Sequence, residues 1–353
     1  MIRLPGLIDI HVHLREPGEE NKEDFSTGTS AALKGGFTTV LAMPNTNPPI
    51  LDAETLRIAN DLAHAKAHCD YGIYLGGGEH NALDAASAAG QAAGLKLYLN
   101  ATYGPLLLEQ LSSWMAHFEQ WPQSRPIVAH AEDKTLAAYL MLSHLYRRPV
   151  HVCHVARKHE ITLIREAKSR GLPVTCEVTP HHLFLTEADG KALPRGRERV
   201  SPALGTEEDL KALWDNLDVI DCIASDHAPH TLAEKDSQEP PPGFPGLEST
   251  LPLLLDAVQD GRLTMDDIIE KLVLNPRRLF SFPEQEETWV EVDETHRYEL
   301  KGSEMFTKAK WTPFEGRTVR GLVRRVVLRG ETVYQDGKVT IQGGFGRNIR
   351  DLY

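Results

Sequence analysis

Eight short apolar runs recur along the first 225 residues, and helix-like segments separate them. Several runs are continuously apolar rather than alternating, which is typical of parallel strands buried on both faces. The runs cover residues 7–12, 37–43, 71–76, 95–99, 125–131, 150–155, 172–178 and 219–225. This alternation predicts an α/β fold, either a (β/α)8 TIM-like barrel or a doubly wound sheet. We favour the barrel because polar, chemically competent residues end nearly every run.

The pattern changes near residue 284. Before it, residues 25–36, 52–69 and 158–171 carry helix signals, such as an acidic start or a final glycine. After it comes a charged, irregular stretch, followed by short β runs punctuated by glycine. We therefore predict a barrel over residues 1–285 and a small β-rich annex with the C-terminal tail over residues 286–353.

Charge and cysteine content narrow the class of protein. The net charge is −12, with 41% hydrophobic and 25% charged residues, which is ordinary for a soluble globular chain. The negative charge argues against nucleic-acid or anionic-membrane partners. The four cysteines form no CxxC pair, and no apolar stretch reaches transmembrane length. We expect free thiols, a reducing compartment and a cytoplasmic location.

Histidine and aspartate residues stand where the apolar runs end. His11 and His13 close the first run, and four other runs are followed by His130, His154, the pair His181 and His182, and Asp226. One buried histidine is more often structural, and a His-x-His pair alone can simply line a polar pocket. Five strands that end in histidine or aspartate at one face of a barrel favour a shared metal site. Such ligands suit zinc or a related borderline metal ion.

Lys96 lies inside an apolar run, "GLKLYLN". A buried ammonium group costs desolvation free energy unless it is paired or neutralised. An ordinary buried ion pair or a side chain that reaches solvent would each explain it. Beside several histidines, a third explanation is a neutral amine that reacts with carbon dioxide. The resulting carbamate is a carboxylate on a long stem that could bridge two cations.

These residues in this order resemble the amidohydrolase superfamily. The stretches "DIHVHLREPG", "AMPNTNPP" and "ASDHAPH" narrow the resemblance to the dihydroorotases. The stretches "GLKLYLN", "HVCHVARKHE", "PPPGFPGLE" and "WTPFEG" are similar to the dihydroorotase domain of the animal multifunctional pyrimidine-synthesis protein. The resemblance covers nearly the whole chain.

The resemblance implies a zinc-dependent enzyme of de novo pyrimidine biosynthesis. It would interconvert N-carbamoyl-L-aspartate and L-dihydroorotate, with water activated by two zinc ions and Asp226 as general acid and base. The implied ligands are His11, His13 and Asp226 for one ion, His130 and His154 for the other, and carboxylated Lys96 as the bridge. Cys153, Glu177 and His182 would either hold a third metal ion or support the other ligands, and both interpretations stay open.

Substrate contacts are also implied by the resemblance. Arg15, Asn45 and His230 match residues that hold the substrate carboxylate, and the planar guanidinium of Arg15 suits such a group. A surface salt bridge of Arg15 with Glu16 or Glu23 is the plainer alternative.

A flexible loop near residues 100–111 would close over the site through Thr102 and Tyr103. Two positions depart from the animal domain, which typically has phenylalanine at Tyr103 and arginine at Ser201.

Two rival functions remain at this point. Another cyclic amidohydrolase, such as a hydantoinase, dihydropyrimidinase or allantoinase, would share the metal ligands but would not need the carboxylate contacts of Arg15 and Asn45. A catalytically dead scaffold would be expected to lack ligands. The resemblance further implies a homodimer, fused in its parent chain to carbamoyl-phosphate synthetase and aspartate transcarbamoylase. The abrupt start at "MIRLPGLID", without a longer N-terminal β segment, is what we expect of a domain excised from such a chain.

Overall fold

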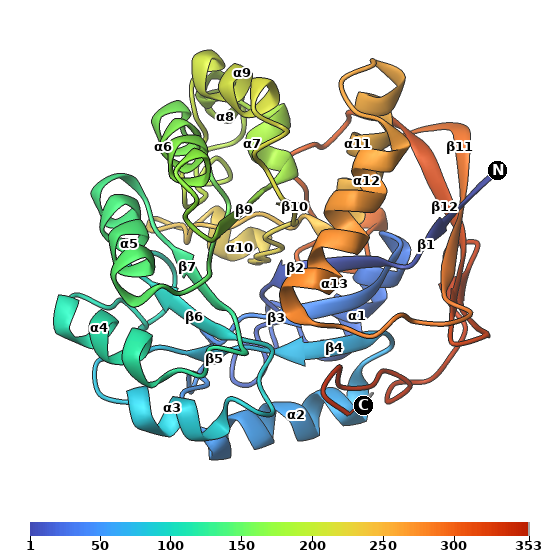
Figure 1. The fold of residues 1–353 in the computed structure, drawn as a ribbon. Helices are drawn as coiled ribbons and strands as arrows, with labels where there is room; N and C mark the ends of the chain where they lie inside the picture. The colour runs from blue at the N-terminus through green and yellow to red at the C-terminus, as the bar shows by residue number, and fades with distance from the viewer. Residues whose placement is uncertain (352–353) are drawn as a thin grey trace.

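A computed structural model describes residues 1–351, and parallel strands form a closed barrel at its centre (Figure 1). One sheet joins β2 (Leu7–Val12), β3 (Phe37–Ala42) and β4 (Asp70–Ile73). The other joins β5 (Leu75–Gly76), β6 (Leu95–Tyr98), β7 (Ile127–His130), β8 (Val150–Val152), β9 (Val174–Val178) and β10 (Cys222–Ile223).

Two backbone contacts close the ring of strands. Only Tyr74 separates β4 from β5, and its N–H donates to Ala42 of β3 at 3.0 Å. At the other seam, the N–H of His13 donates to the carbonyl of His227 at 2.7 Å, beside a parallel bridge between Val12 and His227. The predicted barrel is confirmed, and the doubly wound alternative is wrong because the first and last strands meet.

Helices surround the barrel and follow the strands. They are α1 (Phe25–Lys34), α2 (Ala53–Lys66), α3 (Ala82–Ala88), α4 (Leu111–Gln120), α5 (Asp133–Tyr146), α6 (Lys158–Ser169), α7 (Pro180–Phe184), α8 (Glu187–Ala192), α9 (Glu207–Asp215), α10 (Leu232–Lys235), α11 (Leu247–Gln259), α12 (Met265–Ile269) and α13 (Asn275–Phe280), with a π-helical turn at Glu270–Leu274 and a 3-10 turn at Gly302–Glu304. Side chains of Asp24 and Asp52 cap α1 and α2 by accepting from backbone N–H groups at 2.7 and 2.8 Å. No helix among residues 1–351 is long and apolar enough to cross a membrane.

An antiparallel sheet forms the annex beside the barrel (Figure 1). Its order is β1 (Ile2–Pro5), β11 (Trp289–Glu299), β12 (Thr318–Leu328), β13 (Glu331–Gln335) and β14 (Lys338–Val339). It packs on α11 so closely that a Cβ at Gly321 would lie 2.2 Å from Leu255. The division at residue 285 stays a prediction, and the sheet takes β1 from outside the 286–353 segment.

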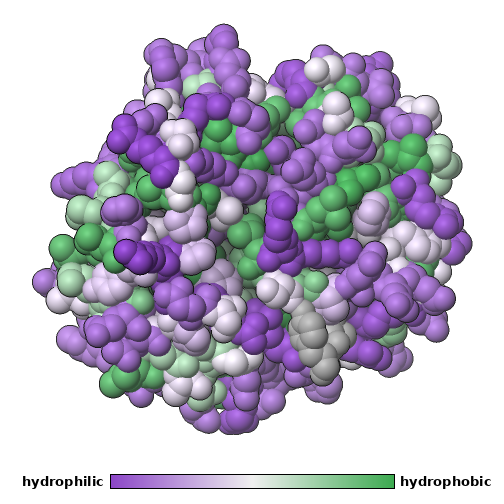
Figure 2. All heavy atoms as spheres, viewed as in Figure 1, coloured by the Kyte–Doolittle hydropathy of each residue, from purple (hydrophilic) through white to green (hydrophobic). Residues whose placement is uncertain are grey.

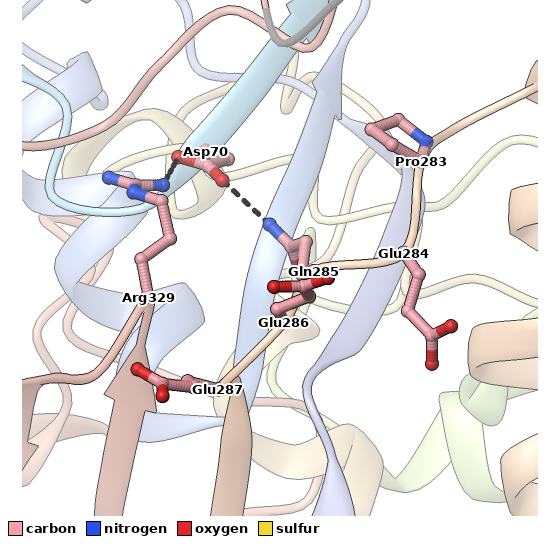
Figure 3. Close-up of a pocket in the computed structure, with 7 residues that line it drawn as sticks. All are labelled: Asp70, Pro283, Glu284, Gln285, Glu286, Glu287 and Arg329. Atoms are coloured by element: carbon pink, nitrogen blue, oxygen red, sulfur yellow. Dashed lines mark hydrogen bonds and ion pairs between the residues drawn. The ribbon is translucent and has the colours of Figure 1, made fainter.

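The annex meets the barrel at the N-terminal ends of the strands. Asp70, the first residue of β4, is fully buried and binds Arg329 and the side-chain amide of Gln285, as Figure 3 shows. These residues line a cavity of about 480 Å³ with 283, 284, 286 and 287. The end of the chain seals the same face, because the N–H of Ile349 donates to Tyr71 at 2.8 Å. This cavity therefore lies opposite the strand ends that carry the histidines.

The face of the molecule shown in Figure 2 is mostly polar. Hydrophilic residues cover most of the face shown in Figure 2, and hydrophobic residues lie between them in separate groups. This distribution agrees with the charged-residue content of 25% and the net charge of −12.

Candidate metal centre and active site

Four histidine rings and one carboxylate meet at the C-terminal ends of the barrel strands. Neighbouring ring centroids lie 5.3 Å apart for His11 and His13, 5.2 Å for His11 and His154, and 4.5 Å for His130 and His154. Asp226 follows β10, and its Oδ1 lies 3.2 Å from Nε2 of His11 and 3.1 Å from Nε2 of His13. All five side chains are buried. The fold thus brings together the histidines that the sequence placed on separate strands.

Hydrogen bonds through Nδ1, on the side of the ring away from Asp226, fix the tautomers of His11 and His13. Nδ1 of His11 donates to Glu177 at 2.5 Å, and Nδ1 of His13 donates to Oδ1 of Asn45 at 2.7 Å. A neutral ring that donates through Nδ1 carries its lone pair on Nε2. Both Nε2 atoms lie within 3.2 Å of Oδ1 of Asp226. Two ring nitrogens and a carboxylate oxygen that converge in this way are a suitable ligand set for a cation.

Burial favours the neutral form of three of these histidines, His13, His130 and His154. It lowers the pKa of His13 to about 4, against its contact with Asp226, and it lowers the pKa of His130 and, strongly, of His154. Burial alone would raise the pKa of Asp226, but His11 and His13 lower it well below its ordinary value. Neutral imidazoles and an ionised carboxylate are the protonation states that metal binding requires.

Lys96 lies fully buried in β6 beside these ligands. Its Nζ contacts Sγ of Cys153 at 3.0 Å and lies 5.1 Å from the centre of the Tyr98 ring. Within residues 1–351 no carboxylate forms an ion pair with it, so neither an ordinary ion pair nor solvent accounts for this side chain. The carbamate formed with carbon dioxide therefore stays open as an explanation for Lys96.

Cys153 and Glu177 approach the centre from β8 and β9, but His182 does not join them. Ligand atoms of Cys153, Glu177 and His11 lie within 4.8 Å of one another. His182 belongs to α7, which turns its ring away, so that its nitrogens lie 2.7 Å from Thr179 Oγ1 and 3.1 Å from the carbonyl of Pro202. The cluster in the structure therefore contains His11 where the sequence prediction had His182.

His151 is a buried member of the site that the sequence prediction missed. Its Nε2 lies 3.2 Å from Oε2 of Glu177, whose other oxygen receives the His11 hydrogen bond. Strand alternation offered a signal, because positions 151 and 153 of one strand point to the same side. Tyr98 was missed as well, and its buried hydroxyl has no hydrogen bond among the described residues.

Arg15 and His230 form the polar wall next to the metal ligands. Nε of Arg15 donates to the carbonyl of Pro229 at 3.1 Å, and Nη2 lies 3.1 Å from Nε2 of His230. Nη1 of Arg15 is buried and has no hydrogen bond within residues 1–351. The side chain is 2% exposed, so a surface salt bridge with Glu16 or Glu23 does not explain it. Burial, followed by the charge of Arg15, lowers the pKa of His230 well below its ordinary value.

The loop after β6 closes the site. The Tyr103 hydroxyl contacts Glu19 and Lys22, and its ring lies 4.8 Å from His230 and 4.9 Å from the Arg15 guanidinium. The carbonyl of Tyr103 accepts from Nδ2 of Asn45 at 2.9 Å. With the loop in this position the cavity has a volume of about 20 Å³, room for about one water, so a larger molecule would require the loop to open. Its lining brings together His11, His13, Arg15, Asn45, Tyr98, Thr102, Tyr103, His130, His154, Ser201, Asp226, Ala228, Pro242 and Gly243.

Comparison with known proteins agrees with this arrangement. A family profile described as Dihydro-orotase-like matches residues 1–104. A dihydroorotase from Pyrococcus abyssi is 39% identical over 366 residues, covering 96% of this chain and 85% of the relative. The chain belongs to the dihydroorotase family. A relative with higher identity, 57% over 350 residues, is the multifunctional protein CAD of Squalus acanthias, and there the match covers 99% of this chain but 16% of the relative.

Solved structures share the fold of this family member. L-hydantoinase from Arthrobacter aurescens superposes with a TM-score of 0.94 at 24% identity, covering 98% of this chain and 88% of that one. The inactive dihydroorotase-like domain of a Chaetomium thermophilum CAD-like multifunctional protein gives 0.84 at 30% identity, with 98% of both chains covered. The barrel with a β annex is thus an amidohydrolase fold.

Proposed function

We propose that this chain is an active dihydroorotase, which catalyses the reversible ring closure of N-carbamoyl-L-aspartate to L-dihydroorotate. One observation carries the proposal. The cavity lined by the histidines and Asp226 is also lined by Arg15, whose buried Nη1 has no hydrogen bond among the described residues. A hydrolytic centre and a carboxylate-binding group therefore face the same small space, as a cyclic amide with a carboxylate requires.

The residues at the strand ends fit a pair of zinc ions. Nε2 atoms of His11 and His13 already converge with Asp226, and the buried Nδ1 of His154 has no partner among the described residues. His130 would complete the second site, with carboxylated Lys96 between the two. When bound, zinc lowers the pKa of water and polarises the amide carbonyl. Cys153 and Glu177 with His11 would hold a third ion or orient the ligands.

Asp226 would move the proton. Its carboxylate is ionised at neutral pH, because the neighbouring imidazoles lower its pKa despite its burial. In ring opening it would accept the proton of the attacking water at a carboxylate oxygen and deliver it to the leaving ring nitrogen. In ring closure it would return that proton to the departing water. Arg15, Asn45 and His230 would hold the α-carboxylate in place throughout.

An assay in both directions tests this function. We expect the zinc-loaded protein to interconvert dihydroorotate and carbamoyl-aspartate, to lose activity on chelation and to regain it with added zinc. Mass spectrometry under native conditions should detect the carbon dioxide adduct on Lys96. Turnover of hydantoin or allantoin, with none of dihydroorotate, would favour the rival cyclic amidohydrolases. Ser201 stands where the animal domain has an arginine, and it is the residue that favours these rival enzymes. Failure to bind zinc would favour a scaffold.

The multifunctional relative also suggests which enzymes this chain works with. This chain spans 16% of the length of the CAD relative, so we propose that it works as one domain fused to carbamoyl-phosphate synthetase and aspartate transcarbamoylase, in the cytoplasm. We further propose a homodimer. Neighbouring helices α4 and α5 expose Leu111, Met115, Met141 and Leu145, an apolar surface that a second copy would cover.

A charge on this surface is expected to separate the dimer. Leu145 is 65% exposed, so replacing it by glutamate should leave the fold intact while placing a carboxylate in the interface. Sedimentation equilibrium would give a dimer for the wild type and a monomer for Leu145→Glu. The same change at Leu274, which is exposed elsewhere, serves as the control and should remain dimeric.

Removing the Tyr103 hydroxyl is expected to loosen the loop. Tyr103→Phe keeps the ring against Arg15 but removes the hydroxyl that binds Glu19 and Lys22. Loss of these two hydrogen bonds, each contributing about 1 kcal/mol, should speed hydrogen exchange of residues 101–106 by at least roughly fivefold. Tyr98→Phe removes a hydroxyl without a hydrogen bond in the described chain and should leave exchange unchanged. Equal exchange in wild type and Tyr103→Phe would show that the hydroxyl does not restrain the loop.

A further inference from the structure

Lys235, the last residue of α10, is fully buried and forms no ion pair among the described residues. Its Nζ donates to the backbone carbonyls of Arg199 at 2.8 Å, Pro241 at 2.9 Å and Gly243 at 3.3 Å. An ammonium group has three N–H donors, and here a carbonyl takes each one.

Such a buried cation needs an explanation. Burial lowers the pKa of Lys235 to about 7, whereas the charge of Glu198 favours its protonated form. The ring centres of Trp311 and Phe244 lie 5.4 and 5.7 Å from Nζ and offset part of the desolvation cost. An apolar side chain would fill this space at a lower cost. The role of the ammonium group is therefore to hold the backbone segments whose carbonyls it binds.

Those segments form one wall of the active-site cavity. Ser201, Pro242 and Gly243 line it. The Gly243 carbonyl itself accepts from Lys235, Pro242 follows Pro241, and Ser201 lies two residues after Arg199. The N–H of Gly243 also donates to Arg199 at 3.0 Å, which joins the two segments directly. Gly243 has φ +145°, and a Cβ there would lie 2.5 Å from the carbonyl of Ala228. The wall is close-packed, and its position depends on contacts outside the cavity.

We propose that Lys235 is a positioning residue that holds segments 199–201 and 241–243 in place against bound substrate. It does not line the cavity, so it acts through the backbone of these segments rather than on the reacting atoms. The inference rests on the proposed dihydroorotase function, because the wall is defined by the cavity that would hold dihydroorotate.

The chain offers a matched control for this lysine. Lys271 is also buried, and its Nζ donates to the carbonyls of Leu217 at 2.9 Å and Ile220 at 2.7 Å. These carbonyls precede β10, at the barrel end opposite Asp226. Replacing either lysine by methionine removes a buried ammonium and leaves backbone carbonyls unpaired. Both variants should therefore lose thermal stability, but only the Lys235 variant should disturb the substrate wall.

The test compares KM with kcat in the zinc-loaded full chain. We expect Lys235→Met to raise KM for dihydroorotate about tenfold, which is the loss of one good contact, with kcat changed by less than about threefold. Bound zinc, measured by atomic emission, should be unchanged, and Lys271→Met should keep the wild-type KM. Isothermal titration with carbamoyl-aspartate, with Asp226→Asn added to both the wild type and Lys235→Met to stop turnover, should give the same loss of affinity.

Several results would overturn the inference. They are an unchanged KM in Lys235→Met, a fall in kcat alone, or an equal rise of KM in Lys271→Met. If Lys235→Met does not fold, Lys235→Gln keeps two N–H donors. A wild-type KM in Lys235→Gln would count against the role if a crystal structure of that variant shows its side chain no longer bound to the three carbonyls. Absence of dihydroorotate turnover in the wild type would instead refute the proposed function.

Discussion

Replacing Asp226 by asparagine is expected to abolish turnover while zinc stays largely bound. The amide keeps an oxygen in place of Oδ1, which faces Nε2 of both His11 and His13. It cannot accept the proton of water, because an amide oxygen is far less basic than a carboxylate. General acid–base catalysis contributes about 10² to 10⁴ in rate, so kcat should fall by at least that order in both directions.

The measurement pairs steady-state kinetics with metal analysis of the same sample. Asp221→Asn is a suitable control, since Asp221 precedes the same strand and pairs with Lys168 at 2.6 Å, away from the cavity. It should retain wild-type kcat and zinc. Near-normal turnover in Asp226→Asn would show that another group moves the proton. Loss of zinc together with activity would mean that the carboxylate acts mainly as a ligand.

The barrel could be predicted from the sequence because its signal is local and repeated. Each apolar run is long enough for one strand, and several are followed by a helix signal such as the Asp52 cap. The annex strand β1 gave no such signal, because residues 2–5 pair with β11, which lies almost at the other end of the chain. Pairing over that separation depends on the folded barrel, and the short segment alone does not reveal it.

The site was predictable in its residue types but not in its orientations. Arg15, His154 and Asp226 have φ values of +61°, +34° and +44°, a region that non-glycine residues seldom adopt. These backbone turns at the strand ends direct the side chains into the cavity. No sequence pattern predicts such turns. The same limit applies to His182, whose helix turns it toward Pro202, and to Asn45, which orients His13 as well as holding the loop.

Replacing Arg15 by lysine is expected to raise KM about 10- to 100-fold for substrates with an α-carboxylate. Hydrogen bonds to charged groups contribute about 1.5–3 kcal/mol, and an ammonium cannot reproduce the planar pair of guanidinium donors. Lysine would also lack the Nε donor that binds Pro229 and would leave His230 without its neighbour. Because Arg15 does not touch the proton-transfer groups, kcat should change less than KM.

A substrate without the carboxylate gives the sharper test. If Arg15 binds that group, Arg15→Lys should weaken carbamoyl-aspartate and dihydroorotate but leave any residual turnover of dihydrouracil or hydantoin unchanged. Arg3→Lys, in the exposed annex strand, controls for loss of a guanidinium elsewhere. An equal effect on both substrate classes would mean that Arg15 supports the fold of the cavity. An unchanged KM would show that Arg15 does not bind the carboxylate. The main argument for dihydroorotate over other cyclic amides would then fail.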